Sequence, residues 1–154
     1  MKKSVLNDDV FYTLMWSRII PYDKYTAARI LPEMAGILCL MENVPNGDPA
    51  YLMFYGCWRE GLRMGLKNLM SPIIQKSRNI AQQFDNRKLL YKYTIVDSSL
   101  QDMQDVMYWL IQNYNPEFNQ ILDFGDSKRY QNIYVKEMTM RDDQYIEKIP
   151  RYGL

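Results

Sequence analysis

The chain contains no histidine. Without an imidazole it lacks the usual general acid and base for work near neutral pH, and Ser-His catalytic arrangements are ruled out. Metal sites that depend on histidine ligands are ruled out for the same reason. Histidine-based catalysis is therefore excluded from the functions considered for this sequence.

Cysteine is scarce too, with Cys39 and Cys57 as the two thiols. Two thiols and no recognisable signal segment predict a reduced, cytoplasmic location, because Asn7-Asp8-Asp9 interrupts any signal-peptide core. No apolar run approaches the length needed to cross a bilayer, so we expect no membrane partner. Both cysteines are interpreted as small buried hydrophobes on strands.

What the sequence does contain is typical of one globular domain. The 154 residues are 47% hydrophobic and 24% charged, and this length is sufficient for a sizeable core. Tyrosine and methionine are frequent, at 13 and 11 residues. Such residues are most often core or interface anchors, and methionine also suits an adaptable binding surface.

The net charge of +1 hides an uneven distribution. Residues 59–92 contain eight basic residues against two acidic ones, whereas the segments on either side are acidic on balance. A basic central third is typical of a surface that faces phosphate groups. The alternative is a solvated pair of helices with ordinary surface lysines.

Hydrophobic spacing predicts an α/β (α+β) fold in one domain, residues 1–154. It consists of a small mixed or antiparallel sheet that starts with a β-hairpin and is packed by helices. An N-terminal helical extension is expected over 1–30, with a first helix capped by Asn7-Asp8-Asp9 and a second at 23–31. The residues from 120 to 154 are expected to be a mainly irregular C-terminal extension. The other predicted elements are strands at 36–42, 51–57, 90–96 and 130–140 and helices at 59–70, 72–84 and 100–114.

Basic residues recur at every fourth position in the helix predicted after the hairpin. Arg59, Arg63 and Lys67 therefore stack along one helical face. Tyr55 and Trp58 lie just before this face, where an aromatic ring could stack on a nucleic-acid base. Core or interface packing is the alternative role for these two rings.

Three short motifs occur in order along residues 31–119. They are Leu31-Pro32 with Gly36-Ile37; Phe54-Tyr55-Gly56 with Arg63 on the next helix; and Leu110-Ile111 with Pro116-Glu117-Phe118-Asn119.

These motifs resemble the GIY-YIG nuclease superfamily, most closely the domain of that type at the N-terminus of the bacterial excision-repair nuclease. The predicted order of elements, β-β-α-α-β-α, agrees with that resemblance. The family uses a pair of tyrosines, an arginine, and a glutamate that holds one divalent metal. Residues 1–30 and 120–154 lie outside the resemblance.

Several of the positions that carry the family's chemistry are replaced in this chain. Leu38 stands at the first tyrosine and Phe54 at the second, unless the register slips by one to Tyr55, which would place that phenol on the opposite face of the sheet. Arg63 fills the arginine position. Met107 stands at the glutamate, and a thioether cannot anchor a hard cation. The resemblance therefore implies a degenerate site with no metal and no cofactor.

Three functions remain open from the sequence. The first is a catalytically inactive module that binds nucleic acid or another phosphate-containing ligand through the basic helix face. The second is a protein-interaction or regulatory module, with a protein partner or a homodimer. The third is an active nuclease that requires Mg or Mn, built from Tyr55, Arg63 and a relocated carboxylate. The candidate carboxylates are those of Glu42, Glu60 and Asp105.

Overall fold

The computed structural model describes residues 1–71, 84, 87–119 and 125–140. These residues form a mixed fold of helices and two β-sheets, as predicted. The strands are β1 (Lys2–Leu6), β2 (Asp9–Trp16), β3 (Ile20–Pro21), β4 (Gly36–Glu42), β5 (Ala50–Cys57), β6 (Leu89–Ile95) and β7 (Asn132–Thr139). The helices are α1 (Lys24–Ile30), α2 (Gly61–Leu69) and α4 (Leu100–Tyr114).

One sheet has four strands in the order β3-β6-β4-β5, and all its pairings are antiparallel. The predicted hairpin is confirmed as β4 and β5, in which Leu38 lies opposite Tyr55 and Cys39 opposite Phe54. The predicted third strand is confirmed as β6, on the other side of β4. The second sheet has the order β1-β2-β7, in which β7 runs parallel to β2.

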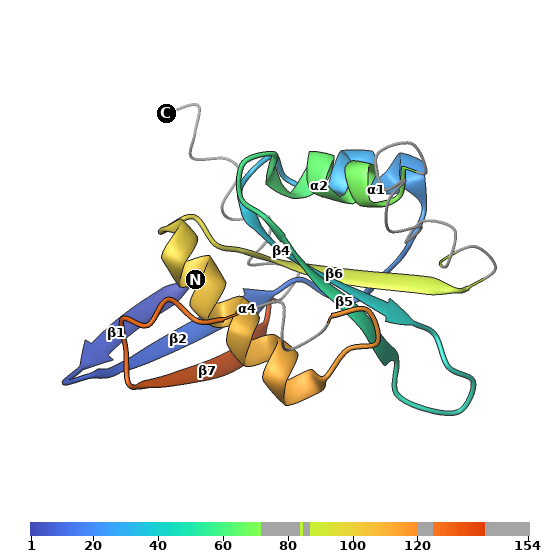
Figure 1. Ribbon diagram of the computed structural model, residues 1–154. Helices are drawn as coiled ribbons and strands as arrows, with labels where there is room; N and C mark the ends of the chain where they lie inside the picture. Colours follow the sequence, from blue (N-terminus) through green and yellow to red (C-terminus); the bar gives the residue numbers. More distant parts are fainter. Residues whose placement is uncertain (72–83, 85–86, 120–124, 141–154) are drawn as a thin grey trace.

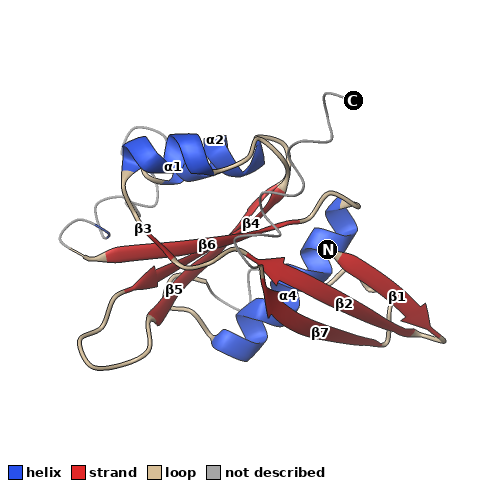
Figure 2. Ribbon diagram, turned by 180° about the vertical axis from the view of Figure 1, so that it is seen from behind, coloured by secondary structure: helices blue, strands red, loops and turns tan. Residues whose placement is uncertain are grey.

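Helices α1 and α2 cover one face of the four-stranded sheet, whereas α4 lies on the other face, between the two sheets (Figures 1 and 2). Each face has its own hydrophobic cluster. We call the one beneath α1 and α2 the outer core and the one around α4 the inner core. The outer core includes Leu38, Leu40, Leu52, Leu62, Leu66, Tyr91 and Tyr93, and the inner core includes Val10, Tyr12, Leu14, Trp16, Phe54, Met103, Met107 and Leu110.

The helix predicted after Asn7-Asp8-Asp9 is wrong, because this segment forms the β1–β2 hairpin. The apolar residues of β2 fit two periods. Alternate residues, from Val10 to Trp16, are buried, whereas Phe11 lies on the other face of the sheet. Asn7 adopts the left-handed conformation (φ 53°) that tight turns require, which Asn tolerates well.

The remaining predictions of elements are mostly confirmed. Asp23 caps α1 through the Thr26 N–H, and Ser99 caps α4 through the Asp102 N–H. The strand predicted at 130–140 is confirmed as β7, so the C-terminal extension is not wholly irregular. The helix predicted at 72–84 lies outside the described residues except for its last residue. Among the described residues, no helix has the length and apolar character needed to cross a membrane.

Candidate phosphate-binding groove

The positions at which the resemblance implies degenerate chemistry lie in the hydrophobic cores. Leu38, Phe54 and Met107 are 0%, 1% and 4% exposed. They do not converge, because Leu38 belongs to the outer core while Phe54 and Met107 belong to the inner core. Tyr55 is partly buried against the outer core, so the phenol does lie on the opposite face of the sheet from Phe54.

Arg63 joins the first two motifs structurally. Its Nε donates to the Leu31 carbonyl (2.9 Å), and its backbone N–H donates to the Pro32 carbonyl (3.2 Å). Its Nη1 lies 2.9 Å from the Glu33 carboxylate. These bonds tie α2 to the segment that leads into β4, so much of the donor capacity of Arg63 is used within the fold.

The glycines of the two strand motifs allow close packing. A Cβ at Gly36 would lie 2.4 Å from the Thr94 carbonyl oxygen and 2.8 Å from a Leu62 methyl group. A Cβ at Gly56 would lie 3.1 Å from the Met103 sulfur of α4. Both positions therefore bring neighbouring elements close to the sheet, a requirement that explains glycine without any catalytic role.

Two of the predicted basic residues meet in a groove between α1 and α2, with a volume of about 510 Å³. Arg63 and Lys67 come from α2, and Lys24 comes from the start of α1. None of the described lining residues is acidic. The other described residues that line it are Tyr22, Tyr25, Ala27, Ala28, Met64, Leu66 and Met70.

Exposed apolar surface and available positive charge coincide in this groove. Tyr25 is 69% exposed and Met64 is 46% exposed. Lys24 Nζ lies 5.0 Å from the centre of the Tyr25 ring, and Lys67 has no ion pair among the described residues. Because Arg63 is already paired with Glu33, the two lysines supply the charge that is free to meet an anion.

The other residues predicted for this site lie elsewhere. Arg59 is exposed before α2, outside the described lining, and Trp58 packs against the inner core. Tyr55 is half-buried against the outer core. Sequence reasoning missed Lys24 and Tyr25, since only the packing of α1 on α2 brings them beside Lys67.

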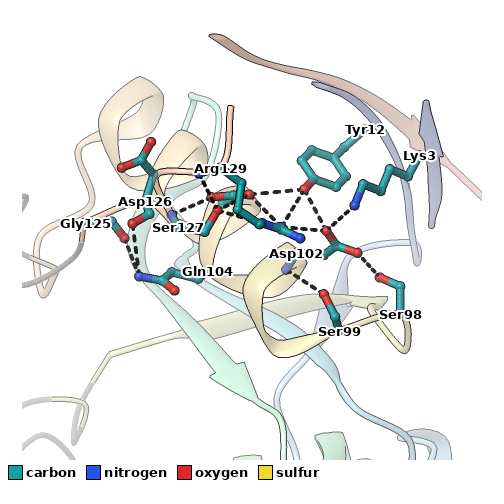
Figure 3. A network of polar contacts seen from close by, with 11 residues as sticks. Lys3, Tyr12, Ser98, Ser99, Asp102, Gln104, Gly125, Asp126, Ser127 and Arg129 are labelled. Carbon is teal, nitrogen blue, oxygen red and sulfur yellow. Dashed lines mark hydrogen bonds and ion pairs between the residues drawn. The ribbon is translucent and has the colours of Figure 1, made fainter. Parts of the chain in front are cut away.

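A polar network that the sequence did not suggest lies at the other end of the molecule (Figure 3). Asp102 and Asp105 of α4 are 3% and 0% exposed. Arg129 Nη2 lies 2.8 Å from Asp102 and 2.9 Å from Asp105, and Lys3 Nζ lies 2.8 Å from Asp102. The Tyr12 hydroxyl donates to Asp102 at 2.9 Å. The network joins β1, β2 and the segment before β7 to α4.

The same network determines the ionisation of its members. Burial alone would raise the pKa of Asp102, but hydrogen bonds from Lys3, Arg129, Ser98 and Tyr12 hold that pKa well below its usual range. Burial and the adjacent carboxylate of Asp102 raise the pKa of the Tyr12 hydroxyl. Asp102 is therefore charged at neutral pH and neutralised by two cations.

The carboxylates considered for a relocated nuclease site are engaged in other contacts. Asp105 accepts hydrogen bonds from Ser127 (N–H at 2.7 Å, hydroxyl at 2.9 Å) as well as from Arg129. Glu42 pairs with Arg87 at 3.3 Å. Among the described residues, no three His, Cys, Asp or Glu side chains gather as a metal site would require.

The two cysteines are free thiols in the cores, as the sequence predicts. Burial raises the pKa of Cys39 to about 12 and also raises that of Cys57. Thiolates are the reactive form of cysteine, so neither group has the character of a nucleophile.

Comparison with known proteins places the chain by its whole length. A family model described as "Uncharacterised protein" matches residues 1–151. The chain belongs to this family. No curated protein and no solved structure matches it.

Proposed function

We propose that this protein is a non-catalytic module that binds nucleic acid, or another phosphate-containing ligand, in the groove between α1 and α2. The observation that carries the proposal is the meeting of Lys24, Arg63 and Lys67 in one groove whose described lining includes no acidic residue. Phosphate groups favour such sites because lysine and arginine replace their counterions. The exposed ring of Tyr25 adds a surface on which a base can stack.

The burial of the degenerate positions supports a binding role without cleavage. Leu38, Phe54 and Met107 carry no group that transfers a proton or holds a hard cation, and they are buried on two faces of the sheet. Asp105 is occupied by Ser127 and Arg129. The proposal keeps the resemblance to the GIY-YIG fold and assigns its surviving motifs to packing.

The test is binding of labelled single-stranded and double-stranded oligonucleotides over a salt series, with magnesium or a chelator. Arg63 is left intact because it also holds Leu31 and Glu33. The variant is Lys24→Gln/Lys67→Gln. Its control, Arg29→Gln/Lys88→Gln, removes the same charge from exposed positions outside the described groove lining.

We expect the groove variant to lower the slope of log affinity against log salt by about 1.4 for a single strand, at about 0.7 per phosphate contact. The control should keep the wild-type slope. Equal binding by the two variants would contradict the groove assignment. Cleavage that a chelator abolishes would contradict the non-catalytic part of the proposal, and stable capture of a protein without nucleic-acid binding would favour an interaction module.

A further inference from the structure

The sheet β1-β2-β7 has one face turned away from α4, and this face carries aromatic and basic side chains in rows (Figures 1 and 2). Alternate residues of β2 face the inner core, so the residues between them face outward. The register of the three strands then defines each row. We call this surface the sheet platform; its central rows are Ser4, Phe11 and Tyr134, and then Lys2, Thr13 and Lys136.

The centre of the sheet platform is a pair of exposed stacked rings. The centroids of Phe11 and Tyr134 lie 4.9 Å apart with an interplanar angle of 13°. The two residues are 39% and 48% exposed, which is unusual for large rings in the middle of a sheet. The neighbouring position on β1 is Ser4, whose small side chain leaves the row unfilled beside Phe11.

The next row supplies positive charge. Lys2 and Lys136 lie on either side of Thr13, at opposite edges of the sheet, and both are exposed. Neither forms an ion pair with any residue that the structure describes. Successive rows on one face of a sheet are about 6.8 Å apart, so a single nucleotide can reach both the rings and the lysines.

We propose that the sheet platform binds single-stranded nucleic acid, with bases stacked on Phe11 and Tyr134 and phosphates paired with Lys2 and Lys136. Aromatic rings interleaved with basic groups on an open surface are the combination that unpaired strands require. A second copy of this chain is a poorer occupant, because a sheet-to-sheet contact would bury unpaired ammonium groups. The inference goes beyond the proposed function, since it involves a different surface and does not need the α1–α2 groove.

The experiment uses the full chain and an oligothymidylate of about 12 nucleotides with one 2-aminopurine, a base whose fluorescence falls when it stacks. The variant Phe11→Leu/Tyr134→Leu keeps apolar strand residues but removes the rings. The variant Lys2→Gln/Lys136→Gln removes the charge, and Arg29→Gln/Lys88→Gln is its charge-matched control. Thermal unfolding establishes that each variant is folded before it is compared.

Wild-type protein should quench the probe. We expect the ring variant to lose the quenching and to bind about tenfold more weakly, while it keeps the salt slope. The lysine variant should lower the slope by about 1.4 and keep the quenching at saturation. Quenching and affinity that are unchanged in the ring variant would overturn the inference.

Two further measurements separate this inference from its rivals. If sedimentation shows a wild-type dimer that the ring variant dissociates, with no effect on oligonucleotide binding, the occupant is a second copy and the inference is wrong. The groove variant Lys24→Gln/Lys67→Gln is measured in parallel. Loss of binding in that variant alone leaves the proposed function standing and rejects the sheet platform, whereas loss in the ring variant alone has the opposite meaning.

Discussion

The side-chain amide of Asn119 pairs with the backbone of Phe54 as a neighbouring strand would. The Phe54 N–H donates to Asn119 Oδ1 at 2.7 Å, and Asn119 Nδ2 donates to the Phe54 carbonyl at 3.1 Å. The preceding residue continues the contact, since the Phe118 N–H donates to the Leu52 carbonyl at 2.8 Å. The closing motif of the sequence therefore covers the edge of β5 and satisfies backbone groups that the sheet leaves open.

Removal of this amide should destabilise the protein strongly. Asn119→Ala leaves a buried N–H and a buried carbonyl of Phe54 without partners, so we expect a loss of about 2–4 kcal/mol in the free energy of unfolding. Urea unfolding measures it. Asn113→Ala is the matched control, because that exposed amide makes one bond within its own helix and should change stability by less than about 0.5 kcal/mol. Equal midpoints for the two variants would show that the pairing contributes little.

The ion network on α4 makes a second prediction. Arg129→Met leaves Asp105 without a cation and Asp102 with Lys3 alone, so unfolding should become easier by about 3 kcal/mol. Lys128→Met removes a neighbouring pair with Asp126 whose lysine is 85% exposed, and it should change stability by less than about 1 kcal/mol. If the double variant Arg129→Met/Asp102→Asn lost the sum of the two single effects, the two groups would not be coupled.

Stability should fall in acid because the pKa of Asp102 is depressed in the folded protein. The unfolded chain binds its proton near pH 3.9, whereas folded Asp102 binds it only at lower pH. The contribution of this group is therefore complete above about pH 4 and is lost as the pH falls further. Melting temperatures measured from pH 7 to pH 2 should decline less in Asp102→Asn than in the wild type. Parallel curves would assign the acid sensitivity to other carboxylates.

Restoring the family's metal ligand should not restore chemistry. Met107→Glu places an unpaired carboxylate among Phe54, Met103 and Leu110 in the inner core, which we expect to cost several kcal/mol. Met107→Leu conserves volume and should cost less than about 1.5 kcal/mol. The readouts are urea unfolding and magnesium-dependent cleavage. A stable, cleaving Met107→Glu protein would show that this position opens onto a site.

Local patterns predicted most of the elements around the four-stranded sheet. The apolar face of 100–114, bounded by a capping serine and by Asn115 in the left-handed conformation, has one period and one interpretation. The hairpin is similarly determined by two short apolar runs around a turn. The N-terminal strands were missed because Val10, Leu14 and their neighbours fit the helix period as well as the strand period. Pairing with β7, far along the chain, decides between them.

The candidate site was only partly predictable. The four-residue spacing of α2 correctly placed Arg63 and Lys67 on one face, and both line the groove. Lys24 entered from a different helix, and no local pattern marks that contact. Arg59 has the right spacing but lies before the first turn of α2, outside the described lining.

The sequence by itself determined the mixed fold, the hairpin, the amphipathic helices and the absence of histidine chemistry. These follow from composition and from periods of a few residues, which any local stretch of chain displays. The tertiary structure alone decided that the motif residues pack rather than react, that two lysines from different helices share a groove, and that Asp102 and Arg129 meet. Such contacts join residues distant in the chain, and they depend on how whole elements pack on one another.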